Sequence, residues 1–438
     1  MSKGFLGLVT TLLAGASLAL AQPAPPPPSA RPSAPPTEPA SDLPSLEPQP
    51  GHHPGGPSPC PDAACCWEVP ACADPRFWIG AEYLLWWVKE GPLPTPLVTT
   101  SPLGSAGILG MPGTTVLFGG DGIDYDTFSG LRGTIGRRLG SSGIYAAELS
   151  GFFLEEGTTS FARISDTAGN PLLARPILNA VTVEQTSVLV AAPGSFAGGI
   201  RVASTSQLWG AEANLLASLL AQGETGLSVL AGFRYLELDE DLDILSRSNV
   251  LPGGVSAFEG MTVLSPDSLA IRDTFGTRNR FYGGQVGLRG SVRRGRLLVD
   301  VTGKVAFGDI NQVIKIGGRT TLVTPEGIAG IAPGGVLALP SNMGRHGDAD
   351  FAYIPEAILR ASLQITPRLS AHVGYTILYW DNVVRPGDQI NRAISLTQVP
   401  SSLQFGTGTG DLRLEPRRPR NDSHFWAQGL SLGLAFRY

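Results

Sequence analysis

Long apolar runs, lysine and net charge are all scarce in this sequence. Beyond the N-terminus, no run of about 18 apolar residues could cross a bilayer as a helix, which excludes a bundle of membrane-spanning helices. Only four of the 438 residues are lysine, charged residues make up 16% of the chain, and the formal net charge is −5. Because a phosphate-binding face needs clustered basic residues, these values predict no nucleic-acid partner. Glycine (56) and proline (37) are abundant instead, which argues against a helical bundle.

The first residues are organised like a secretory signal. Lys3 precedes an apolar stretch over residues 5–20, and Ala19 and Ala21 form the small-x-small pattern that precedes cleavage. We therefore predict a signal peptide over residues 1–21, with an uncleaved membrane anchor as the alternative. Residues 22–59 are rich in proline, alanine and serine, which predicts an extended, disordered linker. It is either a passive spacer or a segment that binds a partner.

Cysteine is restricted to one short segment, residues 60–75, which holds Cys60, Cys65, Cys66 and Cys72. In an exported chain, an even and closely spaced set favours local disulfides, and the pairing stays open. The spacing lacks the paired C-x2-C of structural zinc sites. A metal site and free or intermolecular thiols are the alternatives to disulfides. We predict no metal and no cofactor.

The last residues alternate strictly between apolar and small side chains. In residues 426–438 one parity carries Leu430, Leu432 and Leu434 between aromatic residues, and the other carries glycine, alanine and serine. This period of two predicts a strand with two different faces. Aromatic residues at both ends of the apolar face are typical of a strand that crosses a bilayer.

The same alternation recurs along the chain, in residues 77–87, 143–153, 209–215, 229–235, 282–292, 297–307, 351–365 and 371–380. A membrane-spanning strand needs about 9–11 residues. In hydrocarbon every backbone amide must be paired, and strands achieve this only in a closed barrel. With weaker segments near 130–139 and 312–323, the sequence predicts an all-β fold. This fold is an antiparallel transmembrane β-barrel of roughly 12–14 strands over residues 76–438. We expect its long loops near residues 155–206, 237–279 and 324–349.

The polar parity of these strands would line the lumen. Its charged residues are of mixed sign: Glu148, Glu212, Arg234, Arg289, Asp300, Lys304, Glu356 and Arg360. Opposed carboxylates and guanidinium groups in an open lumen would order water and select small polar or charged solutes. Alternatively, the same residues form inward salt bridges that plug or stiffen the barrel. The spacing does not distinguish the two.

Several stretches resemble one known family. They are residues 77–87, 110–114, 169–176, 279–285 and 425–429, and the most specific is residues 375–392, which read YTILYWDNVVRPGDQINR. These stretches resemble the beta barrel porin-7 family of outer-membrane proteins, and the likeness extends over residues 77–438. The resemblance implies a porin-like barrel. Asn391 stands where we would expect an acidic residue.

Two features go with this resemblance. The motif loop after Trp380 carries Asp381, Arg385, Asp388, Gln389 and Arg392, which either pair locally at the rim or fold inward and narrow the pore. The C-terminal Phe436 and Tyr438 resemble the signal by which outer-membrane barrels are recognised for assembly. No catalytic motif stands out, because the G-x-S-x-G match at 429–433 lies inside a predicted strand and a nucleophile elbow needs a strand-to-helix turn. We predict that the protein is not an enzyme.

The sequence therefore predicts a passive channel for small polar or charged solutes in the bacterial outer membrane. The alternative is a plugged barrel with a structural or surface-interaction role, tethered to the envelope through its proline-rich leader. A soluble, secreted β-sandwich is a third hypothesis. The expected partners are outer-membrane lipid, the barrel assembly machinery and small solutes, and analogy with porins adds a homo-oligomer.

Overall fold

The structure is a computed structural model, and it describes residues 76–407, 415–417 and 420–438. The predicted signal (1–21), linker (22–59) and cysteine segment (60–75) lie outside these residues. Within the described ranges the only helices are three short 3-10 turns, η1 (Leu103–Ser105), η2 (Pro386–Gln389) and η3 (Leu396–Gln398). None of the described helices is long and apolar enough to cross a membrane.

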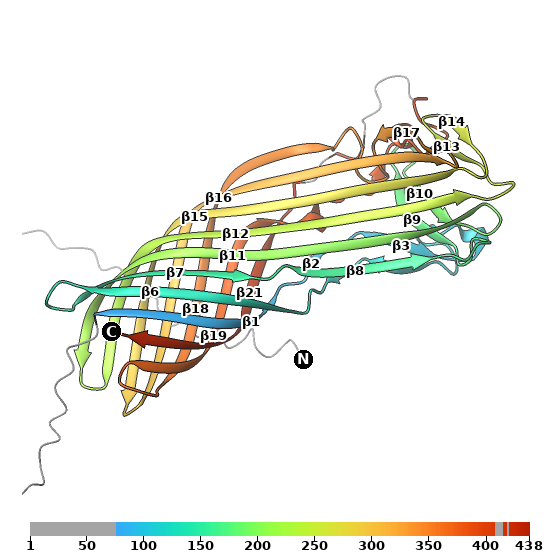
Figure 1. Cartoon of the computed structure of the whole chain (residues 1–438). Coiled ribbons are helices and arrows are strands. Elements are labelled where there is room, and N and C mark those ends of the chain that lie inside the picture. The colour runs from blue at the N-terminus through green and yellow to red at the C-terminus, as the bar shows by residue number, and fades with distance from the viewer. Residues whose placement is uncertain (1–75, 408–414, 418–419) are drawn as a thin grey trace, which may run out of the picture. The chain divides into compact units, whose positions relative to one another are not determined.

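Ten antiparallel strands form a closed ring in the part of the chain that the structure describes (Figure 1). They are β1 (Phe77–Val88), β6 (Thr127–Leu139), β7 (Tyr145–Leu154), β11 (Phe196–Gln222), β12 (Thr225–Val250), β15 (Ser268–Arg294), β16 (Leu297–Thr324), β18 (Gly344–Gln364), β19 (Leu369–Val384) and β21 (Asp422–Arg437). The ring closes because β1 pairs with both β6 and β21, and β11 pairs with both β7 and β12. The antiparallel barrel predicted from the sequence is thus confirmed.

Two shorter strands raise the main sheet to twelve strands among the described residues. β8 (Gly157–Ile164) continues the row of β7 along β11, and β17 (Gly327–Pro333) folds back on the end of β16. The main sheet thus has twelve strands, but ten of them close the ring, whereas roughly 12–14 strands were predicted for the barrel.

The outer face of the ring carries an apolar belt. Leu131, Leu215 and Leu432 are 60–65% exposed, and similar side chains alternate with inward residues on the other strands. Large apolar side chains exposed all round a ring are costly in water and favourable in hydrocarbon.

Rows of aromatic rings mark the edge of this belt. Trp209 and Tyr282 both contact Tyr235, at centroid distances of 4.9 and 5.1 Å, and thereby join β11, β12 and β15. Tyr353 and Tyr379, with centroids 6.3 Å apart, join β18 and β19 in the same way. Amphipathic rings in this position suit the interface between hydrocarbon and water.

Four ring strands continue far beyond the belt. β11, β12, β15 and β16 are 26–28 residues long, whereas a bilayer needs about 9–11. The long loop expected over 237–279 is therefore wrong for most of its length, because β12 reaches Val250 and β15 begins at Ser268. The expected loop at 155–206 likewise contains β8, β9, β10 and the start of β11, and the loop at 324–349 contains β17.

Polar outward side chains explain why residues 237–279 resemble a loop in the sequence. Beyond the aromatic row, β12 presents Asp239 and Asp243 outward, and they pair with Arg278 and Arg272 on β15. Alternation of acidic and apolar residues therefore continues, but the outward face is polar because it no longer meets lipid.

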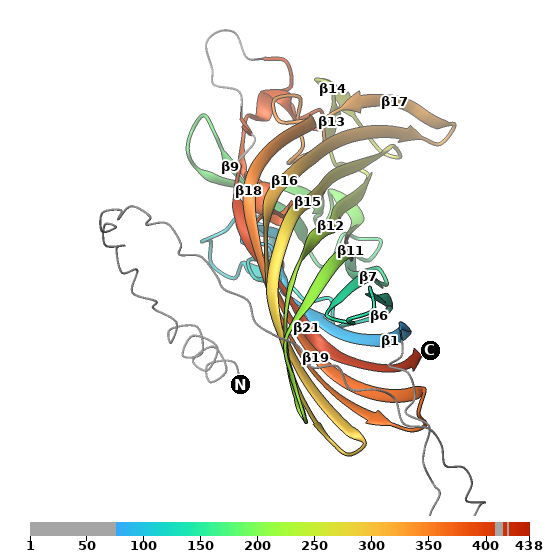
Figure 2. The ribbon, with the colours of Figure 1, turned by 90° about the vertical axis from the view of Figure 1, so that its left-hand side faces the viewer.

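A smaller sheet fills the concave side of these extensions (Figures 1 and 2). This inner sheet consists of β3 (Pro96–Thr100), β4 (Thr115–Gly119), β9 (Leu173–Asn179), β10 (Gln185–Ala191) and β20 (Ala393–Ile394). Two short antiparallel pairs, β2 (Gly91–Pro92) with β5 (Gly122–Ile123) and β13 (Ser256–Phe258) with β14 (Met261–Val263), complete the connections. Leu97 and Ile177 of the inner sheet share one core with Leu238 and Phe275 of the ring.

Candidate functional site: a charged cavity below an apolar layer

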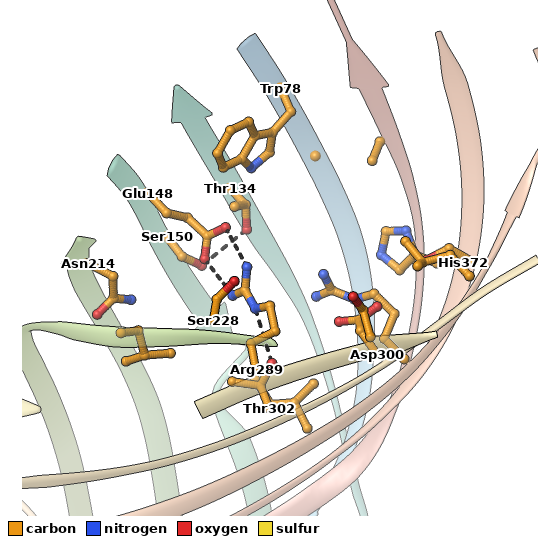
Figure 3. Close-up of a pocket in the computed structure, with 18 of the residues that line it drawn as sticks. Trp78, Thr134, Glu148, Ser150, Asn214, Ser228, Arg289, Asp300, Thr302 and His372 are labelled. Atoms are coloured by element: carbon orange, nitrogen blue, oxygen red, sulfur yellow. Dashed lines mark hydrogen bonds and ion pairs between the residues drawn. The ribbon is translucent and has the colours of Figure 1, made fainter. Parts of the chain in front are cut away.

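The lumen at the short-turn end of the ring holds a cavity of about 550 Å³. Because successive side chains of a strand alternate between faces, the polar parity of each ring strand points into it. All eight charged residues assigned to the lumen from the sequence line this cavity: Glu148, Glu212, Arg234, Arg289, Asp300, Lys304, Glu356 and Arg360. Figure 3 shows several of them converging from different strands.

One group of ion pairs crosses the lumen. Arg234 on β12 bonds Glu356 on β18 at 2.6 Å, although two strands separate them in the ring. Lys304 on β16 lies 2.6 Å from Glu212 on β11 and 3.3 Å from Glu356. Arg234, Lys304 and Glu356 are almost fully buried, so these contacts cross-link β11, β12, β16 and β18 inside the lumen.

A second ion pair also joins two strands that are separated by two others in the ring. Arg289 on β15 donates to both carboxylate oxygens of Glu148 on β7, at 3.0 and 3.3 Å, and to the Thr302 hydroxyl at 3.2 Å (Figure 3). Asp300 also faces the cavity, but within the described residues it makes no ion pair.

Among the cavity residues that the sequence analysis missed are Glu82, Arg132 and His372, which form one cluster. Glu82 on β1 is a buried carboxylate that contacts Arg360 at 2.5 Å, His372 at 3.3 Å and Arg132 at 3.4 Å. A signal was present in each strand: Glu82 stands on the parity opposite to Tyr83 and Trp87, as inward residues do. Reading each predicted strand for every charge on its polar parity would have found the cluster.

An apolar layer closes the cavity on the side of the long strands. Every ring strand contributes an inward side chain that is at most 3% exposed: Trp86, Phe128, Leu154, Leu208, Leu236, Phe281, Ile310, Ile354, Trp380 and Phe425. All ten belong to one hydrophobic cluster. A water-filled path along the axis would leave some of these side chains in contact with water, so the described lumen is closed at this layer.

The motif loop folds inward, onto this layer. The guanidinium group of Arg385 donates to Glu240 at 2.5 and 2.8 Å and to the carbonyl oxygen of Glu90 at 2.6 Å, and it lies 5.5 Å above the ring of Phe425. Gln389 is also fully buried and donates to the carbonyl oxygen of Asn421 at 2.8 Å.

The other residues predicted for the motif loop, Asp381, Asp388 and Arg392, are half-buried. Burial raises the pKa of Asp388, and Arg392 donates to the side chain of Gln185 at 3.2 Å. Asp381 lies at a break in the β19–β21 pairing, between Trp380 and Val383. The loop is thus a lid over the apolar layer rather than a free rim loop.

The C-terminal residues complete the ring. Phe436 points outward with 42% of its surface exposed, and the backbone of Tyr438 exchanges two hydrogen bonds with Phe77, at 2.8 and 2.9 Å. The last strand is therefore held against the first one.

Comparison with known families decides the identity of this barrel. The model of the family described as "Putative beta barrel porin-7 (BBP7)" matches residues 78–438. The chain belongs to this family. The match spans the whole ring, the inner sheet and the motif loop, so the charged cavity and the apolar layer are features of a BBP7 barrel. No curated protein matches the chain.

This BBP7 chain is similar to several solved structures at low sequence identity. The outer membrane protease OmpT from Escherichia coli is 12% identical, with a TM-score of 0.39, and the alignment covers 85% of this chain and 100% of OmpT. The CymD monoaromatic hydrocarbon channel is 8% identical, with a TM-score of 0.18 and coverage of 84% and 89%. A Pseudomonas aeruginosa FadL homologue is 8% identical, with a TM-score of 0.19 and coverage of 83% and 90%.

Proposed function

We propose that this BBP7 protein is a bacterial outer-membrane barrel with a closed lumen and a structural or surface-interaction role. The observation that carries the proposal is the apolar layer, to which all ten ring strands contribute buried side chains. The number of strands in the ring agrees with this proposal. Barrels of about eight strands are filled by side chains, whereas those of 16–18 strands leave an aqueous channel, and the ten strands of this ring are closer to the first class.

The orientation follows from the lengths of the connections. Outer-membrane barrels have short periplasmic turns and long extracellular segments. The short turns of this ring therefore face the periplasm, and the inner sheet with the long ends of β11, β12, β15 and β16 faces the outside. Phe77 begins β1 at the short-turn end, so the predicted leader, residues 22–59, would lie in the periplasm and could tether the barrel to the envelope.

Lipid and the assembly machinery are the partners that the outer face supports. The apolar belt with its aromatic rows suits outer-membrane lipid. Phe436 and Tyr438 end the strand that closes the ring, which is where a C-terminal assembly signal would act before closure. Loss of membrane insertion on removal of these two residues would support this role.

Planar-bilayer recording of the purified, refolded protein tests the closed lumen. Folding is first established by heat-modifiable gel mobility, since a closed barrel migrates differently before and after boiling. We expect no steady conductance from the folded wild type. Stepwise conductance from the same preparation would overturn the closed-barrel proposal.

A channel for small polar or charged solutes is the second candidate, favoured by the polar cavity and by the family. It requires the apolar layer to open. Arg385 lies on Phe425 of that layer and anchors the motif loop to Glu240 on β12. Conductance that appears on Arg385→Met, but not in the wild type, would favour a gated channel. No conductance from either protein would favour the closed barrel.

A further inference from the structure

Arginine residues ring the open end of the cavity. The last inward position of β6, β15 and β21 is occupied by Arg138, Arg293 and Arg437, and all three line the cavity at the short-turn end. Their strands end here, so the three guanidinium groups lie where a solute would pass between periplasm and cavity.

A smaller hollow adjoins this mouth and has no acidic residue in its lining. It is bordered by Arg293, Arg296, Arg368 and Arg437, together with hydroxyl and amide groups of Ser362, Ser370, Thr366 and Gln364. Its volume is about 10 Å³, which is room for one water-sized group. The hollow shares Arg293, Arg437, Ser362 and Ser370 with the main cavity, so the two lie side by side.

The arginines of the hollow differ from the cations deeper in the lumen. Arg132, Arg234, Arg289, Lys304 and Arg360 each pair with a glutamate. By contrast, none of the four arginines of the hollow makes an ion pair within the described residues. Arg293 donates to the Gln364 amide oxygen at 3.3 Å, and Arg368 lies 5.4 Å above the ring of Tyr438. Within the described residues, the four arginines of the hollow thus have no carboxylate at ion-pair distance, although Glu224 and Asp300 also line the main cavity.

We propose that this mouth binds an oxyanion of the phosphate type, either inorganic phosphate or the phosphate group of a small solute. Guanidinium groups present fixed pairs of N–H donors that match phosphate oxygens, and the hydroxyl groups of the hollow add further donors. The small hollow accommodates one oxygen of such a group, while the rest of the ligand extends into the 550 Å³ cavity. This site does not depend on whether the lumen conducts.

The direction of the side chains favours a solute over a lipid headgroup. Arg293 has the inward parity of β15, shared with Gln285 and Arg289, whereas its neighbour Arg294 has the outward parity and is exposed. A lipid would meet the outward arginine first. These adjacent residues therefore form a matched pair for a test.

The test uses full-length protein, folded in a zwitterionic detergent and checked by heat-modifiable mobility. Binding of radiolabelled inorganic phosphate is measured by equilibrium dialysis at low ionic strength. We expect Arg293→Gln to weaken binding about tenfold, because one charge-assisted contact is lost, and Arg293→Lys to retain most of it. Arg294→Gln should leave the affinity within about twofold of the wild type.

Three outcomes would overturn the proposal. The first is a wild type that binds no phosphate at millimolar concentration, and the second is equal loss of binding in the two glutamine variants. The third concerns the lipid alternative, tested with mixed micelles that contain phosphatidylglycerol. In this outcome the micelles shift the melting temperature of the wild type and of Arg293→Gln but not that of Arg294→Gln, and free phosphate shifts none of them. That result would assign the charge to lipid binding on the outer face.

Discussion

The buried pair of Arg385 and Glu240 allows a quantitative test of how the motif loop is held. Both side chains are fully buried, and two hydrogen bonds of 2.5 and 2.8 Å join them. Arg385 also donates to the carbonyl oxygens of Lys89 and Glu90, at 3.3 and 2.6 Å. One guanidinium group therefore connects the motif loop, β12 and the segment that follows β1.

Replacing Arg385 by methionine keeps much of its volume but leaves Glu240 as an unpaired buried charge. Removal of one partner of such a pair costs about 3–5 kcal/mol. Since 1.4 kcal/mol is a factor of ten, the unfolding equilibrium constant should rise by about two to nearly four orders of magnitude. The double variant Arg385→Met with Glu240→Leu removes both charges, and we expect it to regain most of the lost stability.

The measurement is the free energy of unfolding in urea, in detergent micelles, followed by tryptophan fluorescence. An exposed ion pair provides the control: Arg420 and Asp348 lie 2.6 Å apart with about 40% of each side chain exposed, so Arg420→Met should cost less than about 1 kcal/mol. The reasoning would be refuted if Arg385→Met cost no more than this control. Strictly additive losses in the double variant would refute it as well.

Two further predictions concern the belt and the long strand ends beyond it. Leu215→Arg places a charge on the lipid face of β11 and should lower the free energy of unfolding in lipid vesicles by about 2–4 kcal/mol, whereas Leu215→Phe should be almost neutral. Burial, and to a lesser extent the carboxylate of Asp239, raises the pKa of Asp241, which lies beyond the aromatic row. A raised carboxyl pKa contributes stability that is present below about pH 4 and is lost as the pH rises through the folded-state value. Urea unfolding between pH 4 and 8 should therefore lose less stability in Asp241→Asn than in the wild type, and equal pH profiles would contradict this assignment.

The facing of the strands was readable from the sequence because side-chain direction has a period of two, which is a local property of the chain. All eight charged residues that were assigned to the lumen by parity line the cavity. The apolar belt follows from the same period. Glu82 follows the same rule, because it stands on the parity opposite to Tyr83 and Trp87 and lines the cavity.

The extent of the barrel was less visible in the sequence. Segments such as 237–250 continue the ring with acidic residues outward, which looks like a loop when the outward face is expected to be apolar. The position along a strand at which its outward face passes from lipid to water depends on how far the strand extends along the barrel axis. That extent is set by the register with neighbouring strands, so the composition alone did not reveal it.

The sequence by itself determined that the chain forms strands, that they close into a membrane barrel, and which charges face its interior. Only the tertiary structure decided that Arg234 meets Glu356 and that Arg385 meets Glu240, because these partners come from strands or loops distant in sequence. It likewise decided that the lumen is closed by ten buried side chains. Side-chain direction is local, but contacts across a lumen depend on strand number, register and the folding of long connections, which are properties of the closed ring as a whole.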